Sequence, residues 1–159
     1  MRFSSFMTAS LTAALLAAAP LASAQTTDRR VITLDGAKAI LAAAEAEAVK
    51  NKWTVAIAVV DESGNLIAFH RIDDTQVGSI DIALGKARTA ARMKRPTKAL
   101  EDAVAGGRTV MLAIEGITPL EGGVPVMLDG RVIGAVGVSG VTSQQDARVA
   151  QAGAAALKR

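Results

Sequence analysis

The chain shows two hydrophobic spacings, one helical and one extended. From residue 34 to about 52 the apolar side chains recur every three or four positions, which predicts a helix with one buried face. Thr33 stands where its hydroxyl can cap that helix. Residues 54–60 form an unbroken apolar run rich in β-branched residues, which indicates a strand buried on both faces. Turn residues at 63–65 then lead into a second strand over 66–71, so a β-hairpin follows the helix.

The second half of the chain predicts further helices and a second hairpin. Its expected elements are helices over 79–94, 97–105 and 142–157, and strands over 109–114, 124–128 and 131–139. Pro96 stops the first of these helices, and Thr97 can cap the short one. Asp129-Gly130, set between two apolar runs, is a strong hairpin signal. Thr142, with Gln145 three positions later, is typical of a capping box.

The order of these elements indicates the fold class. Two hairpins require antiparallel pairing, so a doubly wound parallel sheet does not fit. We expect an α/β fold of the α+β type, with a five-stranded, mostly antiparallel sheet flanked by helices.

The N-terminus resembles a secretory signal. Arg2 precedes an uncharged Ala- and Leu-rich stretch, and Ala22-Ser23-Ala24 is a small-x-small cleavage site before Gln25. The apolar stretch is shorter than the roughly 20 residues that span a bilayer, so no stable membrane anchor is expected. We expect residues 1–24 to be a signal peptide, residues 25–31 a polar lead-in and residues 32–159 one domain, in a periplasmic or secreted protein.

Composition excludes several classes of function. The chain has no cysteine, no tyrosine and one histidine, which removes disulfides, thiolate metal sites and multi-histidine metal sites. Residues 1–24 carry one basic and no acidic residue, so the remaining 135 residues hold 17 basic and 15 acidic side chains, a net charge of +2. Because those basic residues are scattered, we expect no nucleic-acid partner.

Two glycine-rich segments have both a structural and a functional interpretation. The stretch 134–140, which includes Ser139 and Gly140, precedes a helix N-terminus where backbone N–H groups could hold an anion. On local features alone, close packing of a strand against a helix is the favoured explanation of these glycines. Gly122-Gly123 is either a flexible turn or a loop that lines a ligand cavity.

Two isolated side chains are candidates for chemistry. His70 lies near the end of the second strand, where a lone histidine is a surface group, a satisfied core residue or a metal ligand. Lys86 lies at the border of the apolar face of its helix, on a line with the small residues Ser79, Ala83 and Ala90. It either extends its charge to solvent or points into a pocket that those residues line.

A series of short motifs resembles the GlcG/HbpS-like family of haem-binding proteins, which is related to the C-terminal domain of PduO. The matching segments are Ala58-Val-Val-Asp61, Gly64-Asn-Leu66, Arg71-Ile-Asp73, Gly85-Lys-Ala87 with Thr89-Ala90, Gly122-Gly-Val-Pro125, Gly134-Ala-Val-Gly-Val-Ser-Gly140 and Gln145-Asp146. They extend over nearly all of residues 32–157, in order and at family-like spacing. The resemblance identifies residues 32–159 as a GlcG/HbpS-like domain.

The resemblance implies a profilin-like α/β fold, self-association into a homo-oligomer, and haem or a similar tetrapyrrole as ligand. It favours haem capture, buffering or sensing over enzymatic activity. One alternative is an enzyme or accessory protein that acts on a small carboxylate or hydroxy acid, held by Lys86 and the glycine loop before Thr142. Another is an interaction module without a small ligand that signals to a membrane sensor protein.

If the domain binds haem, few side chains can hold the iron. The conventional ligands after export are His70, Met93, Met111 and Met127. Imidazole suits ferric iron best, so we expect His70 to be the metal ligand, with Arg71 and Lys86 pairing with the propionates. The glycine loops contribute Gly122, Gly123, Ser139 and Gly140 as further ligand-binding candidates.

Overall fold

A computed structural model describes residue 25 and residues 27–157, so the expected signal segment, residues 1–24, lies outside the described residues. The helices are α1 (Leu34–Lys50), α2 (Ser79–Met93), α3 (Lys98–Ala105) and α4 (Ser143–Ala154), with a 3-10 helix η1 (Thr109–Ala113). The strands are β1 (Ala56–Asp61), β2 (Leu66–Arg71), β3 (Gly123–Leu128) and β4 (Arg131–Ser139). The described chain therefore has the α+β architecture that the hairpins predicted.

The sheet has four strands in the order β2-β1-β4-β3, and every neighbouring pair is antiparallel. The expectation of five strands is wrong, because residues 109–114 do not form a strand. Met111 N donates to Arg108 O and Ile114 N donates to Met111 O, so the segment closes its hydrogen bonds locally. An apolar, β-branched composition predicts a strand only where a sheet edge is available to pair with it.

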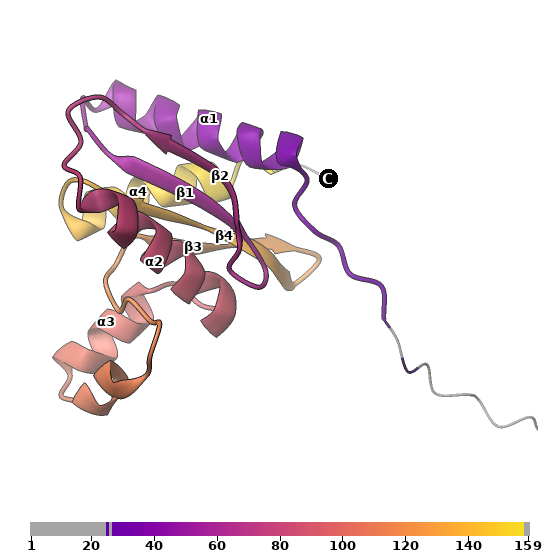
Figure 1. Cartoon of the computed structure of the whole chain (residues 1–159), viewed down its shortest axis with the longest axis vertical. Coiled ribbons are helices and arrows are strands. Elements are labelled where there is room, and N and C mark those ends of the chain that lie inside the picture. Colours follow the sequence, from indigo (N-terminus) through magenta and orange to yellow (C-terminus); the bar gives the residue numbers. More distant parts are fainter. Residues whose placement is uncertain (1–24, 26, 158–159) are drawn as a thin grey trace, which may run out of the picture.

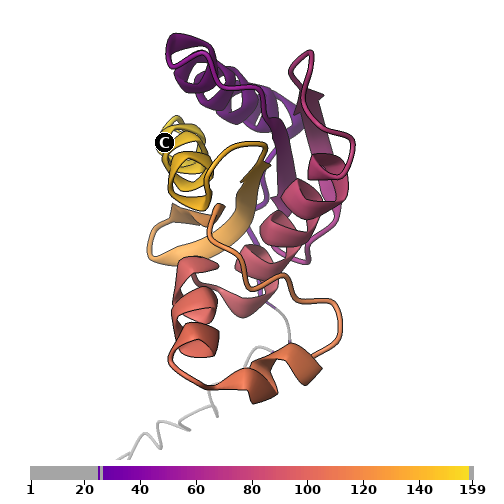
Figure 2. The same cartoon turned by 90° about the vertical axis from the view of Figure 1, so that its left-hand side faces the viewer.

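Helices cover both faces of the sheet. Figure 2 shows α1 and α4 on one side of the strands and α2 on the other. The α1/α4 side holds the larger core, to which β1 contributes Ile57 and Val59, while the α2 side is built almost entirely from alanines. Successive residues of β1 point to opposite faces of the sheet, and both faces are covered by helices, which is why β1 is apolar throughout.

Small side chains let α2 approach the sheet closely. Ala58, Gly137 and Gly123 are register partners in one row across β1, β4 and β3. A Cβ built on Gly137 would lie 2.1 Å from the carbonyl oxygen of Ala83, a backbone atom of α2. Gly137 of β4 therefore serves close packing of helix on strand, the structural interpretation of this segment, whereas Gly134 makes room for the side chain of Ile32.

Most predicted turns and caps are confirmed. Thr33 accepts from Gly36 N, and Thr142 with Gln145 forms the capping box. The last helix ends at Ala154, three residues earlier than expected. Thr97 does not cap α3; its hydroxyl accepts instead from Gly123 N at 2.9 Å and joins the start of α3 to the start of β3.

One part of the structure stands apart from the sheet. Figure 1 shows α3 and the segment after it below the sheet, beyond the end of α2. This lobe contributes few buried side chains: α3 buries Leu100, and η1 buries none.

Candidate functional site

His70 lies on β2, an edge strand of the sheet. It is the register partner of Ile57, which places it on the sheet face that α1 covers. Its Nδ1 lies 2.7 Å from Oε2 of Glu45 on α1, and the two side chains are 50% and 42% exposed. Because an ionised carboxylate only accepts hydrogen bonds, Nδ1 is the donor in this contact, and in the neutral imidazole the lone pair then lies on Nε2. A neutral imidazole with Nδ1–H on a carboxylate is the form that binds metals.

The surface beside His70 is partly apolar. Lys38, Ala42, Glu45 and Val49 follow one stripe of α1 at helical spacing, and Ala42 and Val49 are both exposed. Around Glu45 this stripe therefore exposes apolar side chains and one cation, Lys38. No sequence pattern indicated Glu45 as a site residue. Its hydrogen bond to His70 exists only because the fold brings α1 beside β2.

Arg71 does not share a face with His70. It is the register partner of Ala56, so its side chain starts on the α2 face of the sheet. Arg71 is exposed, and β2 is an edge strand, so its guanidinium can reach a group at His70 only around that edge.

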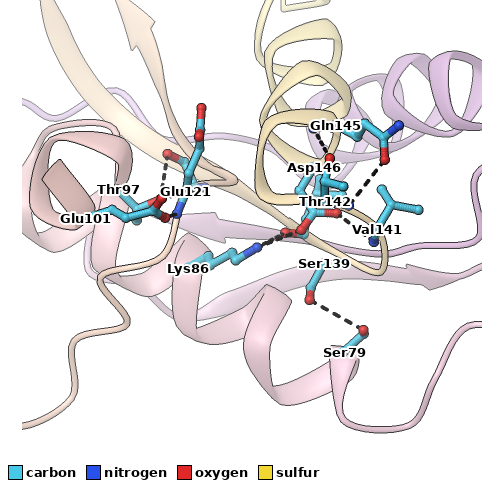
Figure 3. A network of polar contacts seen from close by, with 12 residues as sticks. Ser79, Lys86, Thr97, Glu101, Glu121, Ser139, Val141, Thr142, Gln145 and Asp146 are labelled. Carbon is cyan, nitrogen blue, oxygen red and sulfur yellow. Dashed lines mark hydrogen bonds and ion pairs between the residues drawn. The ribbon is translucent and has the colours of Figure 1, made fainter. Parts of the chain in front are cut away.

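Lys86 lies inside the protein and is already paired. Its Nζ donates to Oδ2 of Asp146 at 2.8 Å and to the carbonyl oxygen of Val138 at 3.0 Å (Figure 3). Both charged side chains are 3% exposed. Burial raises the pKa of Asp146, and the ion pair with Lys86 opposes this only in part. The ammonium is thus directed at α4 and β4 and away from the surface.

The glycine candidates surround the same ion pair. A Cβ on Gly122 would lie 2.8 Å from Lys86 Nζ, and one on Gly123 would lie 2.4 Å from the Lys86 carbonyl oxygen. Ser139 is buried, and its hydroxyl lies 3.4 Å from that of Ser79. A Cβ on Gly140 would lie 2.3 Å from the Thr54 carbonyl oxygen. Lys86 and the four loop candidates therefore form one closed, tightly packed network between α2, β4 and α4, and none of its hydrogen bonds involves His70.

A cavity of about 910 Å³ opens elsewhere, between the polar lead-in and the tip of the β3–β4 hairpin. Its walls come from residues 27–30, 62–63, Lys94 and 127–133. Two ion pairs bridge it, Arg29 with Glu62 at 3.8 Å and Arg30 with Asp129 at 3.3 Å. The sequence marked residues 25–31 only as a polar lead-in, because nothing local signals that they form a wall.

The methionine candidates occupy different places. Met127 is exposed and lies on the cavity wall, whereas Met93 ends α2 and Met111 lies in η1, both half-buried. Lys94 and Arg131 add positive charge beside Met127. Among the described residues no group of three or more histidine, cysteine, aspartate or glutamate side chains could hold a metal ion. No helix within 27–157 is long and apolar enough to cross a membrane.

The fold and the spacing of the motifs define a class of α+β domain, built on a four-stranded antiparallel sheet, that is known from several solved structures. The chain belongs to the family described as haem degrading protein HbpS-like, which it matches over residues 32–155.

Relatives of known sequence support this membership. The chain is 50% identical over 109 residues to protein GlcG of Escherichia coli strain K12, covering 69% of this chain and 81% of GlcG. It is 32% identical over 108 residues to the corrinoid adenosyltransferase PduO of Salmonella typhimurium, covering 65% of this chain and 32% of PduO.

Solved structures agree with the sequence relatives. The crystal structure of HbpS has a TM-score of 0.79 and 34% identity, covering 85% of this chain and 96% of that one. The crystal structure of a PduOC:heme complex has a TM-score of 0.75 and 29% identity, covering 80% and 96%. The predicted family is confirmed, and at least one relative of this fold has been solved with haem.

Proposed function

We propose that this protein binds haem, with His70 as the ligand to the iron, and that it serves haem capture, buffering or sensing. The observation that carries the proposal is the hydrogen bond between His70 Nδ1 and Glu45, which leaves Nε2 free at an exposed position. Support for haem as the ligand comes from the family and from the haem complex of the related PduO domain.

The residues present fit an iron porphyrin. Glu45 orients the imidazole and increases its basicity, as a carboxylate behind a ligating histidine does in metal sites. Ala42 and Val49 offer apolar surface for a flat ring, and Arg71 is the cation that can reach a propionate around the sheet edge. Bound haem would supply redox-active iron. His70 would hold that iron, and Glu45 would orient the imidazole.

The test is a hemin titration followed by absorbance, on the chain that starts at Gln25. The wild type should develop a Soret band that saturates at a defined ratio. His70→Ala should shift the band and weaken binding at least tenfold, and Glu45→Gln should weaken it less, because its amide oxygen still accepts from Nδ1. An unchanged band position and affinity in His70→Ala would remove His70 as the ligand.

The cavity at the β3–β4 hairpin is the second candidate place, because its volume admits a tetrapyrrole and Met127, Lys94 and Arg131 lie on its wall. The matched variant is Met127→Ala. Loss of the Soret shift in Met127→Ala, with His70→Ala unaffected, would indicate that haem binds in the cavity. The proposed function of haem binding would then stand, with a different site.

We further propose that the protein acts outside the cytoplasm after cleavage behind Ala24. The support is the charge, length and small-x-small pattern of residues 1–24. The intact mass of the protein recovered from the periplasm or medium should correspond to a chain that begins at Gln25. A recovered mass that retains residues 1–24 would contradict this.

A further inference from the structure

Two arginine side chains of α2 hold the turn between β1 and β2. Arg92 Nε donates to the carbonyl oxygen of Ser63 at 2.8 Å, and Arg88 Nε donates to that of Gly64 at 3.3 Å. Gly64 has a φ of +89°, and an added Cβ there would lie 2.7 Å from Arg92 Nε and 3.4 Å from Arg88 Cγ. Glycine therefore lets both side chains lie against the same residue, with their Nε atoms on consecutive carbonyl oxygens, so the two guanidinium groups are neighbours.

Neither guanidinium has a counter-charge on the described part of the chain. Within residues 27–157, Arg88 and Arg92 form no ion pair. The acids of the turn are engaged elsewhere, because the Asp61 carboxylate accepts hydrogen bonds inside the turn and Glu62 pairs with Arg29 at 3.8 Å. Two like charges side by side repel each other, and an anion bound to both removes that repulsion.

Each guanidinium also keeps donors for a ligand. An arginine has five N–H donors, and the bond to the turn uses the one on Nε. The tie between helix and turn accounts for that bond alone, which leaves the N–H groups of the two outer nitrogens on each side chain. Arg92 is exposed and Arg88 is half-buried, so an anion in solution can reach both.

A phosphate group matches this pair better than a carboxylate does. A phosphate monoester carries about two negative charges at neutral pH and three acceptor oxygens. It therefore balances two guanidinium groups, whereas a carboxylate brings one charge and two oxygens. The planar guanidinium binds phosphate oxygens in a bidentate way. Lys94 and Arg95, which are exposed just after α2, add further positive charge.

Apolar side chains adjoin the two arginines. α2 packs against β4, β1 and β3 and leaves the same side of β2 largely uncovered. Phe69 of β2 is the register partner of Ala58 and lies half-buried on that side. Leu84, also half-buried, lies one helical turn before Arg88 on the stripe that continues to Arg92. Because Phe69 and Leu84 both border the alanine core, they offer apolar surface to the organic part of a ligand.

We propose that Arg88 and Arg92 bind the phosphate group of a small, free phosphate monoester, whose apolar part lies over Leu84 and Phe69. A phospholipid headgroup such as phosphatidylglycerol offers a diester with one negative charge, which would leave one guanidinium without a counter-charge. The site does not use His70, which lies on the sheet face that α1 covers. The proposal therefore does not rest on haem binding.

The first experiment titrates the nitrogen-15-labelled chain that starts at Gln25 with inorganic phosphate and with phenyl phosphate, while chloride keeps the ionic strength constant. The Nε–H resonances of Arg88 and Arg92 should shift and saturate. That of Arg148, already bonded to Glu47 at 2.7 Å, should not follow them. The absence of a saturable shift, or an equal shift at Arg148, would overturn the proposal. Binding to phosphatidylglycerol vesicles without binding of either free phosphate would overturn it in favour of a membrane surface.

The second experiment compares variants in the same titration. Arg92→Lys keeps the charge but loses the planar donor pair, so phosphate binding should weaken by about fivefold or more. The matched control is Arg95→Gln, which removes a charge beside the site, where Arg95 Nε donates to Met93 O. It should change phosphate affinity by less than about twofold at constant ionic strength. Equal weakening in both variants would indicate diffuse positive charge and contradict a built site.

The third experiment tests the apolar part of the ligand and the independence from haem. Phenyl phosphate should bind about threefold or more tightly than inorganic phosphate, because its ring covers apolar surface. Phe69→Ala should remove this preference, and a preference that is retained would contradict the placement over Phe69. His70→Ala should bind both phosphates as the wild type does, whatever its effect on hemin. The wild-type titration decides the proposal even if a variant fails to fold.

Discussion

The ion-pair network around Lys86 and the exposed segment of residues 105–116, which we call the arm, are opposite in chemistry and in environment. The network places a lysine and an aspartate, each 3% exposed, between α2, β4 and α4. The arm places Val110 and Leu112 in solvent. The local sequence suggests the reverse in both regions. Charged residues such as Lys86 and Asp146 are expected at the surface, and an apolar run such as residues 109–114 is expected in the core.

The difference shows what holds each region. In the network, the Lys86 ammonium donates to the Val138 carbonyl oxygen and to Asp146 Oδ2, and the other carboxylate oxygen of Asp146 accepts from Val141 N, so these buried polar groups are paired. In the arm, local 3-10 hydrogen bonds hold the backbone, and within the described part of the chain η1 buries none of its side chains. Substitutions should therefore change the free energy of unfolding strongly in the first region and little in the second.

The largest effect is expected from breaking the buried ion pair. Asp146→Asn should lower the free energy of unfolding by about 3–5 kcal/mol, because it leaves the Lys86 ammonium buried without a counter-charge. Urea denaturation gives the number. Asp102→Asn is the matched control: Asp102 pairs with Lys98 at the surface, and such pairs contribute about 0–1 kcal/mol. Equal losses in both variants would mean that the Lys86 pair is not closed to water.

The network also explains which parts of the site the sequence could not predict. The family and the positions of His70 and the glycine loops were readable because they are local patterns. The pairing of Lys86 with Asp146 joins residues 60 positions apart, and no spacing rule connects them. For the same reason Glu45 was missed as the partner of His70, 25 positions away.

Element prediction failed where the tertiary environment decided the outcome. The hairpins, caps and helices α1, α2 and α4 follow from turn residues and periodicity, which are properties of the segment itself. Residues 109–114 have strand composition, yet they pair with neither edge strand of the sheet, β2 or β3, and form η1 instead. Composition indicates what a segment can form, and the neighbouring strands decide whether it does.

The second prediction makes the same deletion in both regions. Leu41 is 2% exposed in the core, and Leu112 is 60% exposed in the arm. Leu41→Ala should lower the free energy of unfolding by about 2–5 kcal/mol through lost burial and the cavity left behind. Leu112→Ala should change it by less than about 0.5 kcal/mol in dilute protein. A cost for Leu112→Ala that grows with protein concentration in urea denaturation would place the arm in an interface between copies.

The third prediction tests the close approach of α2 to β4. Gly137→Ala should lower the free energy of unfolding by about 1–3 kcal/mol or more, because the new methyl group meets the Ala83 carbonyl oxygen and must displace the helix. Gly78→Ala is the control, since no atom lies within 4 Å of a Cβ there. Thermal unfolding of the two variants should differ clearly, and similar midpoints would show that α2 can shift without loss.

The smallest effect is expected at Asp61, a surface aspartate that contrasts with Asp146. Burial acts to raise the pKa of Asp61, but hydrogen bonds from Asn65, Ser63 and Gly64 outweigh it and hold that pKa below its ordinary value of 3.8. A lowered pKa in the folded state contributes stability that is present above the unfolded-state pKa and is lost as the pH falls through the folded-state one. The raised pKa of Asp146 acts with the opposite sign. Its contribution to stability is present below the unfolded-state pKa and is lost as the pH rises through the raised folded-state pKa.

Asp61→Asn should therefore reduce stability at neutral pH by less than about 1 kcal/mol, because its hydrogen bonds compete with water. It should also remove part of the decline in stability below pH 4, which urea midpoints measured from pH 2 to 7 would reveal. Asp35→Asn is the control, because Asp35 has one distant surface partner, Lys38 at 3.8 Å. If both variants alter the acid limb equally, the turn hydrogen bonds of Asp61 do not favour its ionised form, and the opposition between the buried and the exposed aspartate does not hold.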